Sequence, residues 1–166
     1  MKKLQLFIIL FPIISISQDR ISASVGNNEI YIETYKHYEF DDSYSLQKAY
    51  RLGPSSAKVL KDGIKTAVKW AELNQKYNRE FNKEISRFSV MEKEIYKFYQ
   101  KYINEFSDEL IMTFKGLESG EFEFEIKNND DFIDFIRIND LEMLINFQNL
   151  INGKSVNNEI DELFKK

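Results

Sequence analysis

Apolar and polar residues alternate over several short stretches of this chain, and apolar residues recur at helical spacing over two longer ones. Residues 29–40 (EIYIETYKHYEF) are rich in Ile, Tyr, Thr and Phe. These side chains are favoured on a pleated surface, so the segment predicts a strand. After a turn at residues 41–43, residues 44–52 predict a second, less regular strand. The first part of the fold is therefore a predicted hairpin.

A long amphipathic helix is predicted after Gly53 and Pro54, where the strand pattern stops. Apolar residues three or four positions apart mark its inner face: Val59, Leu60, Ile64, Ala67, Val68 and Ala71. The hydroxyls of Ser55 and Ser56 are suited to cap its start. The helix is expected to end near Tyr77. A glycine inside a helix costs about 1 kcal/mol relative to alanine, so we expect the packing around Gly63 to offset that cost.

The segment from Lys83 to Glu105 is open to two interpretations, strand or helix. Phe81, Ile85 and Phe88 have the spacing to continue the first helix, whereas residues 84–90 would also suit a short edge strand. Residues 91–105 favour a second helix.

The pattern is clearer in the last third of the chain. Residues 110–115 and 121–127 predict a hairpin around residues 118–120. Its second strand alternates three apolar residues with three glutamates, so one face should be buried and the other in solvent. Residues 132–138 predict another strand. Asn139, followed by Glu142 three residues later, predicts the cap of a helix over residues 141–151, with Gly153 just past its end. Ser155 is expected to begin a short last helix.

These elements predict the α+β class, with an antiparallel sheet of about four to six strands packed on one face by two or more amphipathic helices. A single domain is expected over residues 29–166. Residues 18–28 are polar and contain Gly26 and two asparagines, which predicts a flexible lead-in.

The first seventeen residues have the pattern of a secretory signal peptide. Lys2 and Lys3 precede an apolar run over residues 4–16, and Ser15 and Ser17 supply the small residues of a cleavage site. A bilayer-spanning helix needs about 20 apolar residues, more than this run contains. We therefore expect cleavage near Ser17 and a periplasmic or secreted protein that is not transmembrane. A retained anchor and a buried strand are the alternatives.

Cysteine and histidine usage narrows the possible chemistry. The chain has no cysteine and one histidine, His37, which excludes disulfides and thiolate nucleophiles and makes a zinc site unexpected. No cofactor or metal is predicted, since the acidic turns lack the spacing of a calcium loop. No G-x-S-x-G motif accompanies His37. A small hydrolase using carboxylates near the first strand is the catalytic alternative.

Charge is divided into two blocks of opposite sign. Residues 48–101 hold 13 basic and 6 acidic residues, whereas residues 102–142 hold 3 basic and 12 acidic ones. Four lysines in the basic block share one face of the first helix: Lys58, Lys61, Lys65 and Lys69. This face suits an anionic envelope component such as lipid headgroups or lipopolysaccharide; a solvated helix face and pairing with the acidic block are the alternatives. Nucleic acid is not expected, because the net charge is −4 and no recognition motif is present.

Tyrosines concentrate in the first predicted hairpin, at positions 31, 35, 38, 44 and 50. Tyrosine suits a contact surface, although these side chains would also suit the core of the sheet. Tyr31, Tyr35 and His37 join the four lysines as candidate partner-binding residues. The sequence thus favours an exported, non-catalytic binding or accessory module that contacts a protein or an envelope partner. The hydrolase and a protein that binds anionic lipid or lipopolysaccharide are the alternatives.

Overall fold

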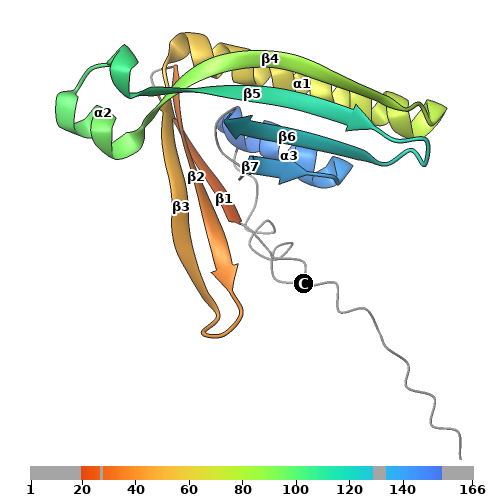
Figure 1. Ribbon diagram of the computed structural model, residues 1–166, viewed down its shortest axis with the longest axis horizontal. Helices are drawn as coiled ribbons and strands as arrows, with labels where there is room; N and C mark the ends of the chain where they lie inside the picture. The colour runs from red at the N-terminus through yellow and green to blue at the C-terminus, as the bar shows by residue number, and fades with distance from the viewer. Residues whose placement is uncertain (1–19, 27, 129–133, 155–166) are drawn as a thin grey trace, which may run out of the picture.

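The structure, a computed structural model, describes residues 20–26, 28–128 and 134–154. These residues form one antiparallel sheet of seven strands accompanied by three α-helices. The order of the strands in the sheet is their order in the sequence (Figure 1). The α+β class and the antiparallel sheet are confirmed, with more strands than the four to six predicted.

The elements, in chain order, are β1 (Arg20–Gly26), β2 (Glu29–Tyr38), β3 (Ser43–Leu52), α1 (Pro54–Tyr77), β4 (Phe81–Glu92), α2 (Lys93–Tyr99), the 3₁₀ turn η1 (Asn104–Phe106), β5 (Ser107–Gly116), β6 (Phe122–Asn128), β7 (Asp134–Ile138) and α3 (Leu141–Ile151). The predicted signal peptide at residues 1–17 and the predicted helix from Ser155 lie outside the described residues.

A narrow junction between β3 and β4 divides the sheet into two parts. These two strands pair only at Tyr50 with Glu92 and at Arg51 with Met91. By contrast, β4 pairs with β5 along nearly its whole length. We call β1–β3 the N-terminal wing and β4–β7 the C-terminal wing. The two wings extend in different directions from their junction (Figure 1).

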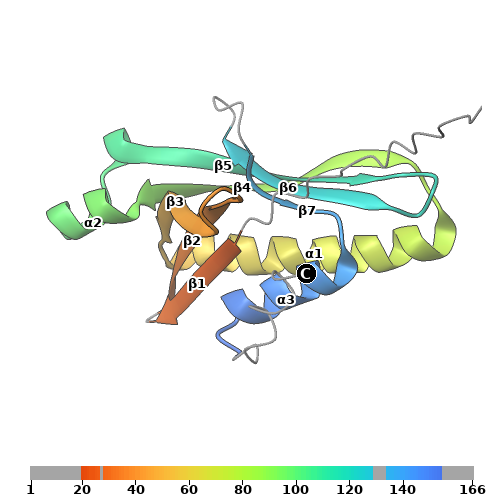
Figure 2. The same ribbon diagram turned by 90° about the horizontal axis from the view of Figure 1, so that it is seen from below.

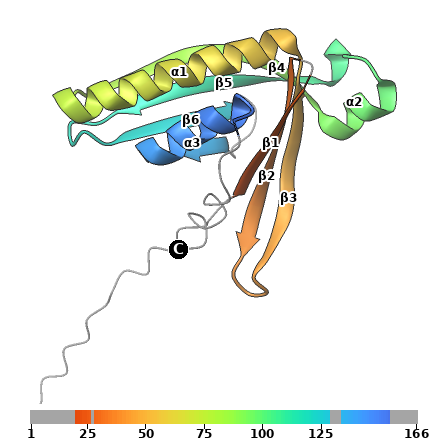
Figure 3. The ribbon, with the colours of Figure 1, turned by 180° about the vertical axis from the view of Figure 1, so that it is seen from behind.

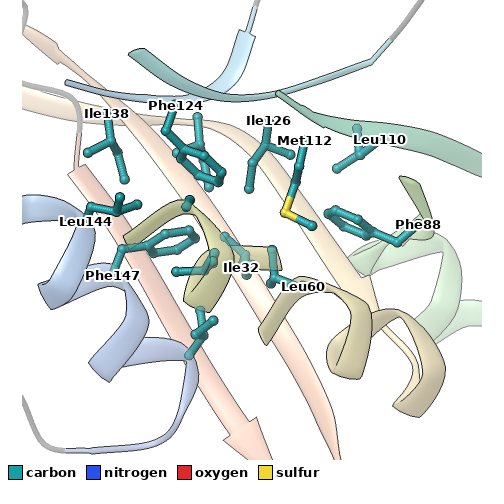
Figure 4. Close-up of a cluster of buried hydrophobic side chains, with 14 of the residues drawn as sticks. Ile32, Leu60, Phe88, Leu110, Met112, Phe124, Ile126, Ile138, Leu144 and Phe147 are labelled. Atoms are coloured by element: carbon teal, nitrogen blue, oxygen red, sulfur yellow. The ribbon is translucent and has the colours of Figure 1, made fainter. Parts of the chain in front are cut away.

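The main core lies between the sheet and helices α1 and α3. Both helices lie on the same side of the C-terminal wing (Figures 2 and 3). α1 contributes the buried residues Leu60, Ile64 and Ala67, and α3 contributes Leu144 and Phe147. Both wings add their inward side chains to the same cluster (Figure 4): Ile30, Ile32, Tyr50 and Leu52 from the N-terminal wing, and Phe88, Leu110, Met112, Phe114, Phe124, Ile126 and Ile138 from the C-terminal wing.

Two strands account for the higher strand count. Residues 20–26, within the lead-in predicted as flexible over residues 18–28, form β1 and pair with β2. Ile21, Ala23 and Val25 alternate with small serines there, a strand pattern weakened by the size of the side chains.

The second additional strand is β4. Of the two alternatives left open for this segment, the strand is confirmed for residues 81–92, although β4 is longer than the short strand considered and lies inside the sheet, not at its edge. The register with β5 shifts between Glu84 and Ser86, and this bulge gives the apolar residues of β4 a spacing that resembles a helix. The second predicted helix is also shorter than residues 91–105, since α2 covers only Lys93–Tyr99.

Helix ends differ from the predictions in two details. Asp140, not Asn139, caps α3, because its Oδ1 accepts the Met143 N–H at 2.8 Å. Gly53 is the N-cap of α1 and provides no side-chain cap, while Ser56 Oγ instead donates to Ser89 O at 2.6 Å. This bond joins the first turn of α1 to β4.

Candidate functional site

The candidate site is the face of the N-terminal wing that points away from the core. Residues along β2 alternate between buried and partly exposed. The buried ones, such as Ile30 and Ile32, join the core. The alternate residues form what we call the outer face, and include Glu29, Tyr31, Glu33, Tyr35 and His37. Three of the predicted site residues therefore lie on one surface.

Strand β3 extends this outer face toward the end of the β2–β3 hairpin. Leu46 lies opposite Tyr35 and Tyr44 opposite His37, after a register shift that follows Thr34. The rings of His37 and Tyr44 lie 4.9 Å apart, and His37 Nε2 lies 2.8 Å from Asp42 Oδ1. The hairpin end thus combines aromatic and apolar side chains with one imidazole.

At the other end of the outer face, α2 packs against the wing through a charged and aromatic contact. Arg51 forms an ion pair with Glu29, with Nε 3.0 Å from Oε2, and its guanidinium lies 3.7 Å from the ring centroid of Tyr96. Only 7% of the Arg51 side chain is exposed. Burial alone would lower the pKa of Arg51, but the hydrogen bond and the charge of Glu29 raise it. Arg51 is therefore a permanent cation that holds α2 in place.

Glu33 is the centre of a second polar contact between β2 and α2. It accepts hydrogen bonds from Lys93 of α2, from Tyr35 Oη at 2.5 Å and from Ser22 Oγ at 3.4 Å. The hydrogen bond from Lys93, followed by that from Tyr35, lowers the pKa of Glu33 below its usual range. The same contact with Glu33 raises the pKa of Tyr35. Glu33 is thus ionised at neutral pH and is not suited to donate a proton.

The corresponding face of the C-terminal wing is different in character, because its charges pair with one another. Arg87 bonds to Glu84 at 2.8 Å and to Glu109 at 3.2 Å, while Lys127 and Arg137 lie 3.1 Å and 2.8 Å from Glu125. Pairs of this kind are typical of a solvated surface.

Exposed apolar side chains gather at two places, the end of the β2–β3 hairpin and the segment from α2 to η1. The hairpin patch, at the end of β2–β3, consists of Tyr38, Phe40, Tyr44 and Leu46, and the α2 patch, from α2 to η1, consists of Phe98, Tyr99, Tyr102 and Phe106. Phe40 is fully exposed, and Phe98 is 81% exposed. In the α2 patch, the ring of Tyr99 lies 5.0 Å from Phe98 and 5.7 Å from Phe106. Both patches belong to segments that project from the body of the fold (Figure 1).

The predicted lysines occupy a separate place. Lys58, Lys65 and Lys69 are exposed and Lys61 is partly exposed on the solvent side of α1. Lys58 pairs with Asp62 at 3.0 Å. The buried side of α1 faces the same core as the inward residues of β2, so the lysines and the outer face lie on opposite sides of that core. The structure does not bring the two predicted groups together.

Sequence reasoning missed the residues that α2 brings to the site, Lys93 and Tyr96, and their partners Glu29 and Arg51. The alternation along β2 identifies the outer face, but the docking of α2 depends on contacts between residues up to 60 positions apart, as in Lys93 with Glu33. Tyr50, counted with the other tyrosines of the hairpin, instead points inward and is 1% exposed.

Within the described ranges, no group of three or more His, Asp or Glu side chains is arranged to hold a metal ion. None of the helices described is long and apolar enough to cross a membrane. Comparisons with protein-family models, with curated proteins and with solved structures found no match to this chain.

Proposed function

We propose that this protein is an exported, non-catalytic binding module that contacts a protein partner in the bacterial envelope. The contact surface is the outer face of the N-terminal wing together with the hairpin patch and the α2 patch. One observation carries this proposal: eight of the eleven exposed large apolar side chains of the described residues belong to these two patches. Clustered apolar exposure of this kind marks interaction surfaces.

The composition and support of the surface fit a protein partner. Phe and Tyr provide a large contact area with few rotatable bonds, and they are enriched where proteins bind each other. The Arg51–Tyr96 contact and the Glu33–Lys93 ion pair hold α2 against the wing. A surface that is ordered before binding loses less conformational entropy when a partner docks.

The hydrolase alternative has less support from the described residues than the binding module has. It needs a carboxyl group that can donate a proton near neutral pH, and Lys93 lowers the pKa of Glu33 instead of raising it. His37 is 18% exposed, but the side chain of Asp42 beside it is 93% exposed, so the carboxylate of this pair is open to water. Export rests on the residue pattern of positions 1–17.

Affinity capture from the native envelope tests the proposal. The bait is the mature form, residues 18–166, compared with the Phe40→Ser and Phe98→Ser variants. Val25→Ser is the matched control, because Val25 is also exposed but lies in β1 and belongs to neither patch. We expect one partner to be captured by the parent chain and by the control, and to be reduced at least tenfold with one or both patch variants. Failure to capture a partner at native concentration, or equal capture by all four baits, would contradict the proposal.

A second candidate function is binding to an anionic envelope surface through Lys61, Lys65 and Lys69. These three side chains lie on one side of α1. They form no ion pair with any residue that the structure describes. Sedimentation with phosphatidylglycerol vesicles tests this function. Substitution of all three lysines by glutamate should abolish association, whereas Lys97→Glu, a change of one exposed lysine in α2, should reduce it only slightly. Unchanged association of the triple variant would remove this candidate.

A further inference from the structure

A groove of about 600 Å³ lies between the last turns of α1 and the first residues of β4. This volume is in the range of sites that bind small molecules. The apolar residues along the groove are Trp70, Leu73 and Tyr77 from α1 and Phe81 from β4. The groove is formed by different elements from those of the outer face and of the two patches.

The base of the groove is a fixed group of aromatic rings. The Trp70 ring meets the rings of Phe81 and Phe114 edge to face, each with centroids 5.8 Å apart, and Phe81 stacks on Phe114 at 5.5 Å. Phe114 is fully buried. Rings packed in this way do not need to rearrange before a ligand binds.

Leu73 and Tyr77 form an apolar wall that the protein leaves open to water. Positions 70, 73 and 77 are three and four residues apart, so these side chains share one stripe of α1. Trp70 packs against the core, whereas Leu73 is 42% and Tyr77 is 58% exposed. The stripe therefore continues past the core and into the groove, where its apolar area is available to a ligand.

The rim of the groove carries more cationic than acidic side chains. Arg79 and Lys83 both border the groove, and neither forms an ion pair with a described residue. The Lys83 ammonium lies 6.0 Å from the centroid of the Trp70 ring. Glu80 is the only acidic side chain along the groove, so the rim carries a net charge of about +1. A negatively charged group on the ligand would complement this rim.

Asn74 is a polar residue of the groove whose side chain is held in place. It is 1% exposed, and its Nδ2 donates to Leu117 O at 3.1 Å and to Glu121 O at 2.7 Å. These bonds join α1 to the turn between β5 and β6. The groove is thus lined by packed aromatic rings and by an asparagine whose side chain is held by two hydrogen bonds.

From the aromatic base, the open apolar wall and the cationic rim, we infer that this groove binds a small amphiphilic anion. The apolar acyl or aromatic body of the ligand lies along Trp70, Leu73 and Tyr77, and its single carboxylate or phosphate group lies between Arg79 and Lys83. Such a ligand would use both surfaces of the groove, which neither a neutral hydrocarbon nor an inorganic anion would do.

Trp70 is the single tryptophan of the chain, so tryptophan fluorescence reports directly on the groove. The purified protein is titrated with decanoate, with decyl phosphate and, for comparison, with decyltrimethylammonium, which has the same tail and the opposite charge. We expect a saturable change in Trp70 emission with one or both anions, and binding at least tenfold weaker for the cation. The double variant Arg79→Gln/Lys83→Gln should weaken anion binding at least tenfold.

Lys97→Gln is the matched control, since Lys97 is an exposed cation outside the groove and outside the lysine row of α1. It should leave anion binding within twofold of the parent chain. The inference is overturned if neither anion changes the emission, if the cation binds equally well, or if Lys97→Gln weakens binding as much as the double variant does. An emission change with phosphatidylglycerol vesicles but not with either free anion would also overturn it, because the ligand would then be a membrane surface.

Discussion

The backbone of Gly63 in α1 lies directly against the side chain of Met112 in β5. A Cβ atom at position 63 would overlap Met112 Cε and would lie 2.9 Å from its Sδ and 3.3 Å from Ser86 Oγ. Met112 is fully buried. Glycine therefore permits the close approach of α1 to the C-terminal wing, and this packing offsets the helix propensity that glycine loses.

The first prediction concerns this contact. Gly63→Ala should destabilise the protein, because overpacking costs about 1–3 kcal/mol, more than the gain of about 1 kcal/mol in helix propensity. Urea unfolding followed by circular dichroism measures the difference. Gly26→Ala is the control, since no atom lies within 4 Å of a Cβ at that position. An increase in the free energy of unfolding for Gly63→Ala would show that Met112 moves aside without cost.

Substitution of Asn74 by aspartate is expected to change the free energy of unfolding by an amount that depends on pH. Asn74→Asp replaces the Nδ2 donor, which bonds to Leu117 O and Glu121 O, by a buried acceptor. We expect Asn74→Asp to lower the free energy of unfolding at pH 7 by more than Asn74→Ala, which costs about 1–3 kcal/mol.

Burial and the two facing carbonyls should raise the pKa of the new carboxyl above its unfolded value. Its protonated form can donate one bond, so the deficit relative to Asn74→Ala should shrink as the pH falls from 7 to 4. Urea titrations at both pH values measure this difference. A deficit that does not change with pH would contradict the assigned role of Nδ2.

The Glu33–Lys93 ion pair predicts a loss of stability in acid. Lys93 lowers the pKa of Glu33, so the pair stabilises the folded state above the unfolded carboxyl pKa of about 4.3. That contribution is lost as the pH falls through the lower folded value. Both side chains are partly exposed, so we expect Lys93→Gln to cost at most about 1 kcal/mol at pH 7.

The difference between Lys93→Gln and the parent chain should decrease between pH 5 and pH 2. Lys97→Gln is the control in the same helix, because the Lys97–Glu94 pair is mostly exposed. Equal pH dependence of the two variants, measured by thermal unfolding, would assign the effect to general charge and not to the contact with Glu33.

The hydrogen bond between Tyr50 and Asp108 is expected to help hold the two wings together. Its Oη donates to Asp108 Oδ2 at 2.9 Å, beside the two residue pairs that join β3 to β4. Tyr50→Phe should destabilise the protein by about 1–2 kcal/mol, because Asp108 loses a donor in a partly buried place. Hydrogen exchange should rise most at Arg51 and Met91. A uniform increase over both wings would instead indicate a global loss of stability.

The sequence pattern was sufficient to predict a strand where large apolar side chains alternate strictly with polar ones. Phe122, Phe124 and Ile126 predict β6 correctly because each is buried while the glutamates between them are not. The inner stripe of α1 is predicted from its helical spacing, and Leu60, Ile64, Ala67 and Ala71 are buried, while Val59 and Val68 are only partly buried. β1 was missed because Ala23 and two serines give little contrast, and β4 stayed open between strand and helix because its bulge shifts the period.

The candidate site, like the fold, could be predicted from the sequence only in part. Alternation along β2 places Tyr31, Tyr35 and His37 on one face, as predicted. The contribution of α2 could not be predicted, because it depends on where the end of β4 lies relative to β3, and only two residue pairs set that position. The groove was missed for a related reason: Leu73 and Tyr77 extend the apolar stripe of α1 to a place where the core has ended.

The matching order of strands in the sheet and in the sequence has a consequence for folding kinetics. Every ladder joins consecutive strands, and most are closed by short connections. Such local pairing has a low entropic cost of loop closure and is associated with fast folding. The β3–β4 connection is the longest, because it contains α1, a helix of 24 residues, whereas the β4–β5 connection contains only the shorter α2 and η1. Each wing is therefore expected to form as a local unit, with the joining of the two wings as the slow step.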